Sequence, residues 1–331
     1  MLFPISWVQI CCLKIQISVG LIINKMLSSR FYKGNIMLMF ARNLAPTFGL
    51  ALFSCAFNAY AESGTESSSQ HSDGSNDSTW FAVVNKSQEE QPHWMTPLVT
   101  ITPRLEEEYR YDQTRQYKSG STTLTNYGGG KGLELIPSEN VETIIGQPGY
   151  LVQQTPATTT RGWADETFLV KYRILSANEE HGNYIVTGFL GLSTPTGNHP
   201  FTVGQTVVTP TLAVGKGWGT REQGVDIQST LSASVPDANQ NVAGLPIVWN
   251  TSLQAHVSNL FWPEIEASYT HWKAGPLAGR NQLIMTYGLI LGRIPLEGRM
   301  KLILGVGYQD AAATAFSTYN RGWVTTARVA F

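Results

Sequence analysis

An alternation of apolar and polar side chains with a period of two runs through most of the C-terminal part of the chain. Apolar residues occupy nearly every second position over 225–235, 249–257 and 300–308, and the positions between are mostly polar, charged or glycine. Similar runs recur and are separated by turns rich in Gly, Pro and Asn. Because successive side chains of a strand point to opposite faces, the pattern predicts antiparallel strands, in a soluble sandwich or in a barrel.

The charge content favours the barrel. Lys, Arg, Asp and Glu make up 14% of the residues, whereas about 25% is usual in soluble domains. After residue 62 no stretch is apolar for long enough to form a spanning helix, which needs about 18 residues or more. We therefore expect an all-β fold, an antiparallel transmembrane β-barrel whose strands separate lipid from water.

The N-terminal region predicts secretion. Residues 39–61 have a basic flank at Arg42, an apolar core and the small-x-small site Ala59-Tyr60-Ala61, as in a signal peptide. Residues 1–38 are interpreted as an extension upstream of a true start at Met37 or Met39, with an inner-membrane anchor as the alternative. A lipoprotein signal ending at Cys55 is a further alternative.

The mature chain would lack cysteine, because all three cysteines precede the cleavage site. Five of the 23 basic residues and none of the 24 acidic ones lie before residue 62, so its charge is 18 minus 24, or −6. This acidic balance argues against nucleic-acid binding. The histidines have no metal-ligand spacing, and we expect no metal, no cofactor and no catalytic residues.

Two regions are expected in the mature chain. Residues 62–96 begin with a Ser-rich stretch and are interpreted as a flexible periplasmic tail. Residues 80–84 could instead form a small plug or docking element. Residues 97–331 are expected to form the outer-membrane barrel.

The last predicted strand gives the most specific indication of an outer-membrane barrel. Trp323 and Phe331 lie at the two ends of an apolar face that also holds Val329, while Thr326 and Arg328 lie opposite. A terminal Phe on such a strand resembles the assembly signal of bacterial outer-membrane barrels, which we assign to Trp323, Val329 and Phe331. It implies that the last strand runs towards the periplasm.

Connection lengths then orient the other strands, since short turns are periplasmic and long loops are external in such barrels. An N-terminus on the periplasmic side requires an even count, which we set at twelve strands, with ten as the main rival. The expected strands are residues 98–111, 117–126, 132–145, 165–176, 184–194, 206–218, 224–235, 247–258, 263–272, 282–292, 298–310 and 321–331.

The apolar register also assigns charged residues to the lumen, because each Arg or Lys at mid-membrane on the lipid face costs roughly 2–4 kcal/mol. Most of them are expected in the periplasmic half, as a selectivity filter or as a salt-bridge network that fills a small barrel. Trp272 shares the inward phase, where it could contact an apolar solute or pack under a loop. The charged set is Arg104, Glu106, Glu108, Arg110, Lys171, Arg173, Asp226, Glu264, Glu266, Arg299, Lys301 and Arg328.

One motif raises the question of catalysis. His256-Val-Ser258-Asn259 is similar to the His-x-Ser-Asn core of outer-membrane lipid hydrolases, in which His activates Ser. Here the pair shares the predicted lumenal face and lies at the periplasmic end, so we do not expect an enzyme. The glycine run 128–132 lacks the Ser or Thr that a phosphate loop places after its Lys and is interpreted as a turn.

The C-terminal half resembles the barrel family called "MetA-pathway of phenol degradation". The similarity lies in 260–266, 279–283, 298–309 and 320–331, and residues 102–109 resemble its first strand. The resemblance implies an outer-membrane transporter for small, aromatic or hydrophobic compounds, with no substrate residues carried over.

We therefore predict a channel for passive uptake of such solutes. Its expected partners are outer-membrane lipid, the solute and the barrel-assembly machinery. A structural envelope barrel with a closed lumen is the first alternative, and a lipid hydrolase using His256 and Ser258 is the second.

Overall fold

The computed structural model describes residues 80–331, except 130, 259 and 313–315. The predicted signal peptide, the predicted N-terminal extension and the first part of the expected tail therefore lie outside the described residues. Within the described part, no helix has the length and apolarity needed to cross a membrane. The two described helices are α3, Trp80–Glu89, and α4, Gln240–Ala243.

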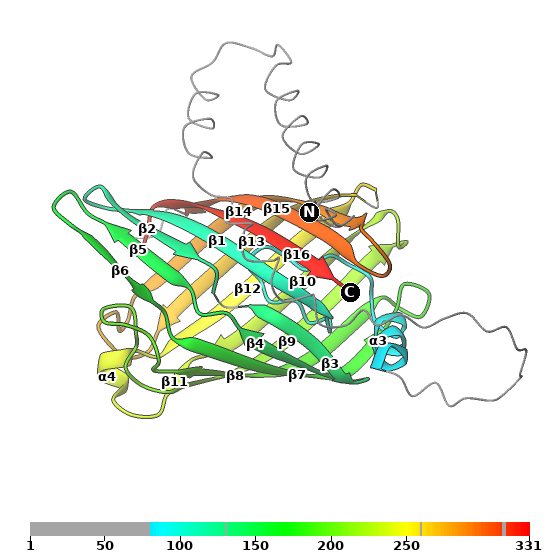
Figure 1. Cartoon of the computed structure of the whole chain (residues 1–331), viewed down its shortest axis with the longest axis horizontal. Helices are drawn as coiled ribbons and strands as arrows, with labels where there is room; N and C mark the ends of the chain where they lie inside the picture. Colours follow the sequence, from blue (N-terminus) through cyan, green and yellow to red (C-terminus); the bar gives the residue numbers. More distant parts are fainter. Residues whose placement is uncertain (1–79, 130, 259, 313–315) are drawn as a thin grey trace, which may run out of the picture. The chain divides into compact units, whose positions relative to one another are not determined.

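The strands form one antiparallel sheet that closes on itself, because β16 pairs with β1 (Figure 1). Their bounds are β1 Glu108–Lys118, β2 Thr122–Tyr127, β3 Gly132–Ser138, β4 Val141–Gly146, β5 Tyr150–Gln154, β6 Thr159–Trp163, β7 Glu166–Ala177, β8 Tyr184–Thr194, β9 Val207–Gly219, β10 Gly224–Ala233, β11 Val235–Pro236, β12 Pro246–His256, β13 Phe261–Trp272, β14 Asn281–Pro295, β15 Lys301–Ala311 and β16 Arg321–Ala330.

The wall has twelve strand positions, as predicted. Strands β2 and β3 both pair with β1 and occupy one position, interrupted at the glycine run. Strands β4 and β5 share the next position, and β6 and β7 the one after, since β5 pairs with β2 and β6 while β4 pairs with β3 and β7. The two-residue β11 only extends the edge of β9.

The two ends of the barrel differ. At one end, here called the turn end, short connections join β3 to β4, β7 to β8, β9 to β10, β12 to β13 and β14 to β15. The opposite loop end carries longer connections, including 195–206 and 273–280. Strand β1 begins and β16 ends at the turn end. The predicted alternation of short and long connections is confirmed from β7 onwards.

The first three predicted strands differ from the structure, whereas the fourth, 165–176, corresponds to β7. The predicted strand 98–111 begins only at Glu108, which is the first residue that pairs with β16 and β3, and the residues before it leave the wall. The predicted strand 132–145 contains a tight turn at 139–140 that no glycine marks. The predicted loop 146–165 contains β5 and β6.

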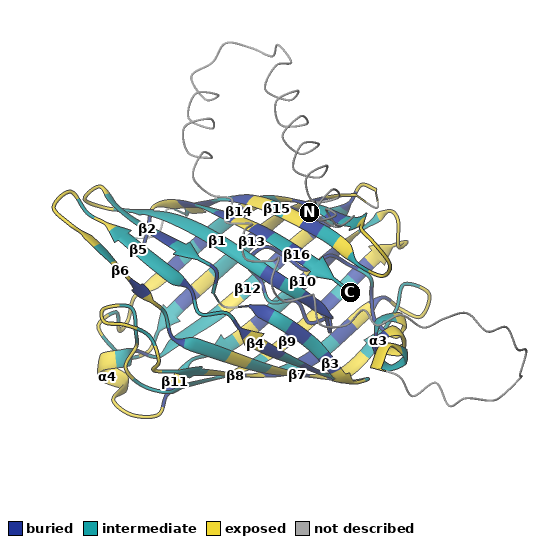
Figure 2. Ribbon diagram, viewed as in Figure 1, coloured by how far each residue is buried: buried dark blue, intermediate teal, exposed yellow. Residues whose placement is uncertain are grey.

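The outer surface of the barrel is apolar, and buried and exposed residues alternate along the strands (Figure 2). Large apolar side chains point outward on successive strands, as Leu190, Leu212, Ile227, Leu253 and Ile265 illustrate, each at least 37% exposed. An apolar belt of this extent is incompatible with an aqueous surface and matches a hydrocarbon layer. The fold is therefore an all-β barrel of the transmembrane type.

Aromatic side chains mark both borders of this belt. Trp218 and Tyr184 lie near the turn end, and Trp249 and Phe168 near the loop end, all exposed. Tyr308 packs edge-to-face on Trp323, also near the loop end, with ring centroids 5.1 Å apart. Aromatic girdles at both interfaces are typical of membrane barrels.

Residues 80–107 differ from the expected flexible tail and first strand. After α3, residues 90–107, here called the inner segment, pass inside the barrel, where Trp94, Met95 and Leu98 are almost completely buried. They form one core with wall residues of β8, β13, β14, β15 and β16, namely Ile185, Trp262, Ile290, Ile303 and Val324. The plug that was the less favoured interpretation of residues 80–84 corresponds to a longer segment whose main burial lies further along.

Candidate functional site

The wall binds the backbone of the inner segment through two glutamates of β13. The Glu264 carboxylate accepts a hydrogen bond from the N–H of Leu98, at 3.1 Å. The Glu266 carboxylate accepts from the N–H groups of Val99 and Thr100, at 2.8 and 2.6 Å. Because the inner segment has no strand partner, these carboxylates satisfy donors that would otherwise be buried without one.

Two arginines bind the carbonyls of the same stretch. Arg328 of β16 donates to the carbonyl oxygens of Thr96 and Pro97, at 2.7 and 3.0 Å. Arg110 of β1 donates to those of Pro97 and Leu98, at 3.2 and 2.7 Å. The stretch 96–100 is therefore held between carboxylates that take its N–H groups and guanidinium groups that bind its carbonyls.

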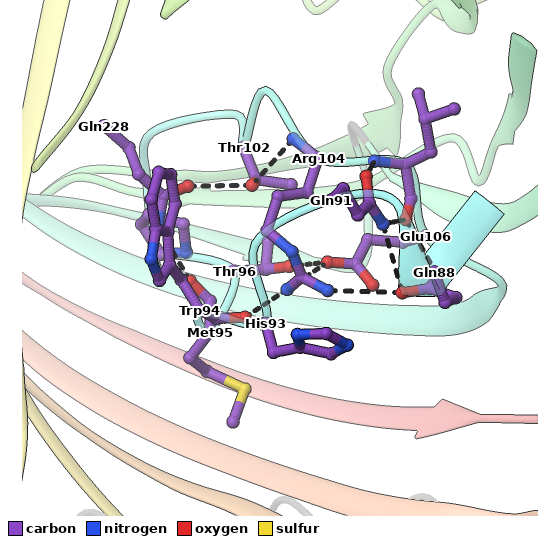
Figure 3. Close-up of polar contacts among 12 residues, drawn as sticks. Gln88, Gln91, His93, Trp94, Met95, Thr96, Thr102, Arg104, Glu106 and Gln228 are labelled. Carbon is purple, nitrogen blue, oxygen red and sulfur yellow. Dashed lines mark hydrogen bonds and ion pairs between the residues drawn. The ribbon is translucent and has the colours of Figure 1, made fainter. Parts of the chain in front are cut away.

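The next stretch of the inner segment is held in the same way from the far side of the lumen. Lys171 of β7 donates to the carbonyl of Arg104, at 3.1 Å, and Thr187 of β8 donates to that of Pro103, at 2.6 Å. Gln228 of β10 accepts from the Thr102 hydroxyl, at 2.7 Å, and donates to the Met95 carbonyl, at 2.9 Å. Figure 3 shows this link beside the Arg104 contacts.

Arg104 and Glu106 fold the inner segment onto itself. The Arg104 guanidinium pairs with the Glu106 carboxylate at 2.9 Å and donates to the Trp94 carbonyl, while Glu106 accepts from the Thr96 hydroxyl (Figure 3). Both residues were predicted on a wall strand. They face the lumen because the segment that carries them lies in it.

Buried ion pairs complete the network. Lys171 pairs with Glu142 of β4 at 2.9 Å, and Arg110 pairs with Asp112 at 2.8 Å. Glu142 also accepts the N–H of Glu106. Removing one member of such a pair leaves an uncompensated buried charge, at a cost of about 3–5 kcal/mol. The network therefore fixes the inner segment more firmly than exposed ion pairs would.

Glycines of the wall form sockets for the apolar side chains of the inner segment. A Cβ on Gly215 would lie 2.5 Å from the Trp94 ring, and one on Gly217 2.5 Å from its indole nitrogen. Leu98 fills a second socket, since a Cβ on any of three glycines would lie within 2.8 Å of its methyl groups, namely Gly288, Gly305 and Gly307. These inward positions must lack a side chain for the segment to fit.

The turn end adds a further contact. Glu179, in the turn after β7, accepts from the His93 N–H at 2.6 Å and lies 2.8 Å from the His93 Nδ1. Burial opposes the charge of Glu179, but its hydrogen bonds with His93 prevail and hold the pKa of this carboxyl to about 2. Burial lowers the pKa of His93, so the neutral ring is the favoured form.

The predicted lumenal charges divide into two groups. Ten are buried inside the barrel, and seven of these contact the inner segment's backbone or belong to it, as described above. Arg299 and Lys301 are exposed at the turn end, with Lys301 in the inward phase of β15 beside Ile303. The ten buried residues are Arg104, Glu106, Glu108, Arg110, Lys171, Arg173, Asp226, Glu264, Glu266 and Arg328.

Several participants were missed by sequence reasoning. Glu142 and Gln228 occupy the polar phase of their strands and could have been found by the same alternation. His93 and Glu179 gave no signal, because one precedes the wall and the other lies in a turn. Arg293, which donates to the Trp94 carbonyl at 3.2 Å, lies at a strand end that was taken for a turn.

Trp272 keeps the inward phase of β13 at the loop end. Its ring packs edge-to-face against Phe316 of the connection between β15 and β16, with centroids 5.9 Å apart. This contact corresponds to packing under a loop. A contact with a solute stays a prediction.

His256 and Ser258 have separate partners. The His256 Nε2 lies 2.7 Å from the Asp226 carboxylate, and its ring stacks on Trp262 with centroids 3.9 Å apart. The Ser258 hydroxyl accepts from the N–H groups of Leu260 and Phe261 and thereby supports the turn after β12. This geometry gives each residue a structural role. Among the described residues, no group of three or more potential ligands is arranged as a metal site.

Below the inner segment, a cavity of about 1140 Å³ opens at the turn end. This cavity, here called the vestibule, is lined by α3, the inner segment, three turns and the ends of β15 and β16. Beyond the inner segment, on the loop side, several inward residues are uncharged and buried, among them Thr230, Thr270, Gln282 and Thr286.

Comparison with known proteins gives fold-level similarities of low identity. No family model matches the sequence. No curated protein matches it either. The resemblance to the "MetA-pathway of phenol degradation" family therefore stays a prediction.

Solved structures that are similar to the chain include an outer membrane channel, a porin and an autotransporter's transport unit. An outer membrane channel from Pseudomonas putida F1 has 14% identity and a TM-score of 0.45, covering 67% of this chain and 92% of that one. The NanC porin has 10% identity and a TM-score of 0.40, covering 67% and 98%. The transport unit of the autotransporter AIDA-I from Escherichia coli has 13% identity and a TM-score of 0.39, covering 76% and 97%.

Proposed function

We propose that this chain is a channel of the bacterial outer membrane that passes small, aromatic or hydrophobic solutes without chemistry, and that the inner segment sets its permeability. The observation that carries the proposal is the content of the lumen. The wall does not fill its interior by itself: the inner segment lies there, held mainly by wall side chains bound to its backbone.

This arrangement favours a channel over a closed structural barrel. The N–H and carbonyl groups of the inner segment can exchange their partners for water if the segment withdraws, because the lumen is polar. The strands keep their own pairing in that state, since the inner segment contributes no strand to the wall. Opening therefore requires movement of one segment and no rearrangement of the barrel.

The chemistry of the lower lumen supports apolar solutes. Withdrawal of Trp94, Met95 and Leu98 would expose the wall residues with which they form a core, among them Ile185, Trp262 and Ile290. These side chains would line the path with apolar surface. A path with both apolar surface and hydrogen-bonding groups suits small aromatic molecules better than strongly hydrated ones.

The test is the conductance of the purified chain in planar bilayers, combined with liposome swelling. The variant Glu264→Ala/Glu266→Ala removes the acceptors of three backbone N–H groups, so we expect more frequent and larger openings and faster uptake of benzyl alcohol. Asp237→Ala, in a loop-end connection, is the matched control. Unchanged conductance and unchanged uptake in the double variant would contradict the proposal and favour a closed barrel.

A further inference from the structure

Four cationic side chains gather on one side of the vestibule. Arg221 lies in the turn between β9 and β10, Arg293 at the end of β14, Arg299 in the next turn and Lys301 at the start of β15, and all four line the cavity. The charged groups that act on the Lys301 ammonium are the three arginines. Like charges repel across a partly desolvated cavity, so an anion bound at Lys301 would relieve the repulsion among these four side chains.

Two arginines of this cationic cluster, Arg293 and Arg299, contact uncharged groups. Arg293 donates to the carbonyls of His93 and Trp94. The Arg299 guanidinium lies over the Phe81 ring, 4.5 Å from its centroid. Among the described residues, none of the four belongs to an ion pair of the kind that Arg104 and Lys171 form.

Three of the seven glutamates that line the vestibule have partners outside the cluster. The seven are Glu89, Glu106, Glu107, Glu108, Glu179, Glu180 and Glu222. Glu106 pairs with Arg104, and Glu179 binds His93. Glu107 accepts hydrogen bonds from the Trp80 indole and from the N–H of Ile136. Arg299 is near enough to Glu107 to affect it, whereas the charged groups that act on Lys301 are arginines.

Apolar surface adjoins the cluster. Met95, Ile303, Ala330 and Phe331 line the same cavity as the four cations. A ligand that satisfies both surfaces needs one negative group and an apolar body of a few carbon atoms. Carboxylates bind Arg and Lys through charge-assisted hydrogen bonds, which are stronger than neutral ones.

We infer that the vestibule is a binding site for small amphiphilic monoanions, of the aromatic carboxylate class, with the carboxylate on Lys301 and Arg221 and the ring against Ile303 and Phe331. The inference rests on the proposed function in that it names the solute class of the channel. It requires only binding, and therefore can be tested apart from permeation.

The test is calorimetric titration of the full chain in detergent with benzoate, benzyl alcohol and inorganic phosphate. We expect benzoate to bind about tenfold more tightly than benzyl alcohol, and phosphate to bind more weakly than benzoate because it lacks the apolar body. The variant Arg221→Gln/Lys301→Gln should lose the preference for benzoate and keep its affinity for benzyl alcohol. Lys273→Gln, at the loop end, should behave as the wild type.

Equal affinities for benzoate and benzyl alcohol would overturn the inference, as would a double variant that retains the preference. Phosphate binding as tight as benzoate binding would overturn the amphiphilic class, because it would indicate a site for the charge alone. Retained affinity for benzyl alcohol shows that the double variant is folded. A chain that binds benzoate but passes no solute would contradict the proposed function and leave this site standing.

Discussion

At the scale of single residues, the glycine sockets give the barrel its specificity for one lumenal segment. The Gly215 socket is bounded by the Trp94 ring and by Pro103, neither of which can move freely. The contact at Gly292 differs, because the nearest atom is the flexible end of Met95. The same substitution should therefore have different costs at the two sites.

We expect Gly215→Ala to lower the free energy of unfolding by about 1–3 kcal/mol through overpacking against Trp94. Gly292→Ala, the matched control, should cost less, since Met95 can adopt another rotamer. Urea unfolding in lipid vesicles measures both. In combination with Trp94→Leu, the cost of Gly215→Ala should largely vanish, and additive effects in this double-mutant cycle would contradict the socket.

His93 makes docking of the inner segment sensitive to acid. Burial lowers its pKa, so the docked state binds fewer protons than the withdrawn state. Docking is therefore complete above the ordinary histidine pKa of about 6.5 and weakens as the pH falls below it. Hydrogen exchange of the His93–Met95 amides, corrected for intrinsic rates, should accelerate between neutral pH and about pH 5 relative to strand amides.

The control is His93→Gln, which does not titrate. Its amides should show no acceleration relative to the strands over the same range. Glu179 stays ionised throughout, since its pKa is about 2. Equal pH dependence in the wild type and in the variant would remove His93 as the cause.

At the scale of elements, the even count required by a periplasmic N-terminus led to the prediction of twelve strands. The period-two alternation was sufficient to predict the last nine strands and the inward direction of most of their charges. These follow from sterics and solvent alone, because a strand between lipid and water has no other way to place Lys171 or Glu266. Residues 104–110 continue the same alternation, yet only 108–110 lie in the wall. The sequence pattern reports which face is polar and does not report whether a partner strand exists.

The inner segment could not have been predicted for the same reason. Its polar groups are satisfied by side chains from β1, β7, β8, β10, β13 and β16, which come together only after the barrel closes. No local signal marks residues 90–107 as lumenal. Glycines at inward wall positions, such as Gly288 and Gly305, are a sequence feature that reflects the presence of a segment inside the lumen.

A charge on the outer face of a strand tests the assignment of that face. Ile265, on β13, is 47% exposed and points away from the lumen. We expect Ile265→Arg to lower the free energy of unfolding in lipid vesicles by roughly 2–4 kcal/mol. Val203→Arg, in the loop-end connection 195–206, should have an effect near zero, and a similar loss in both variants would argue against a lipid-facing belt.

At the scale of the whole molecule, closure depends on the chain ends. The last residue donates its N–H to the Glu107 carbonyl at 3.1 Å, next to the final pair between β1 and β16. Phe331 therefore lies at the seam where the first and last strands meet. We propose that this residue acts with Trp323 and Val329 as the assembly signal.

We expect Phe331→Ala to reduce the fraction of chain that reaches the heat-modifiable, folded form in bacterial outer membranes. Its stability after refolding into detergent should change little, since the terminal side chain is only partly buried. Leu296→Ala, another apolar residue exposed at the turn end, is the control. Normal assembly of the Phe331→Ala variant in cells would contradict the proposed role of Phe331 as an assembly signal.

The way in which the wall holds the inner segment has a consequence for variation. Glu264, Glu266, Arg328, Arg110, Lys171 and Thr187 all bind main-chain atoms, which every residue type supplies. The binding of the inner segment by the wall therefore depends little on the segment's side chains, apart from those in the glycine sockets. A position such as Ile101 is free to diversify, unlike Val99, which packs against the core, and a channel built on this plan can acquire a new constriction while its wall stays the same.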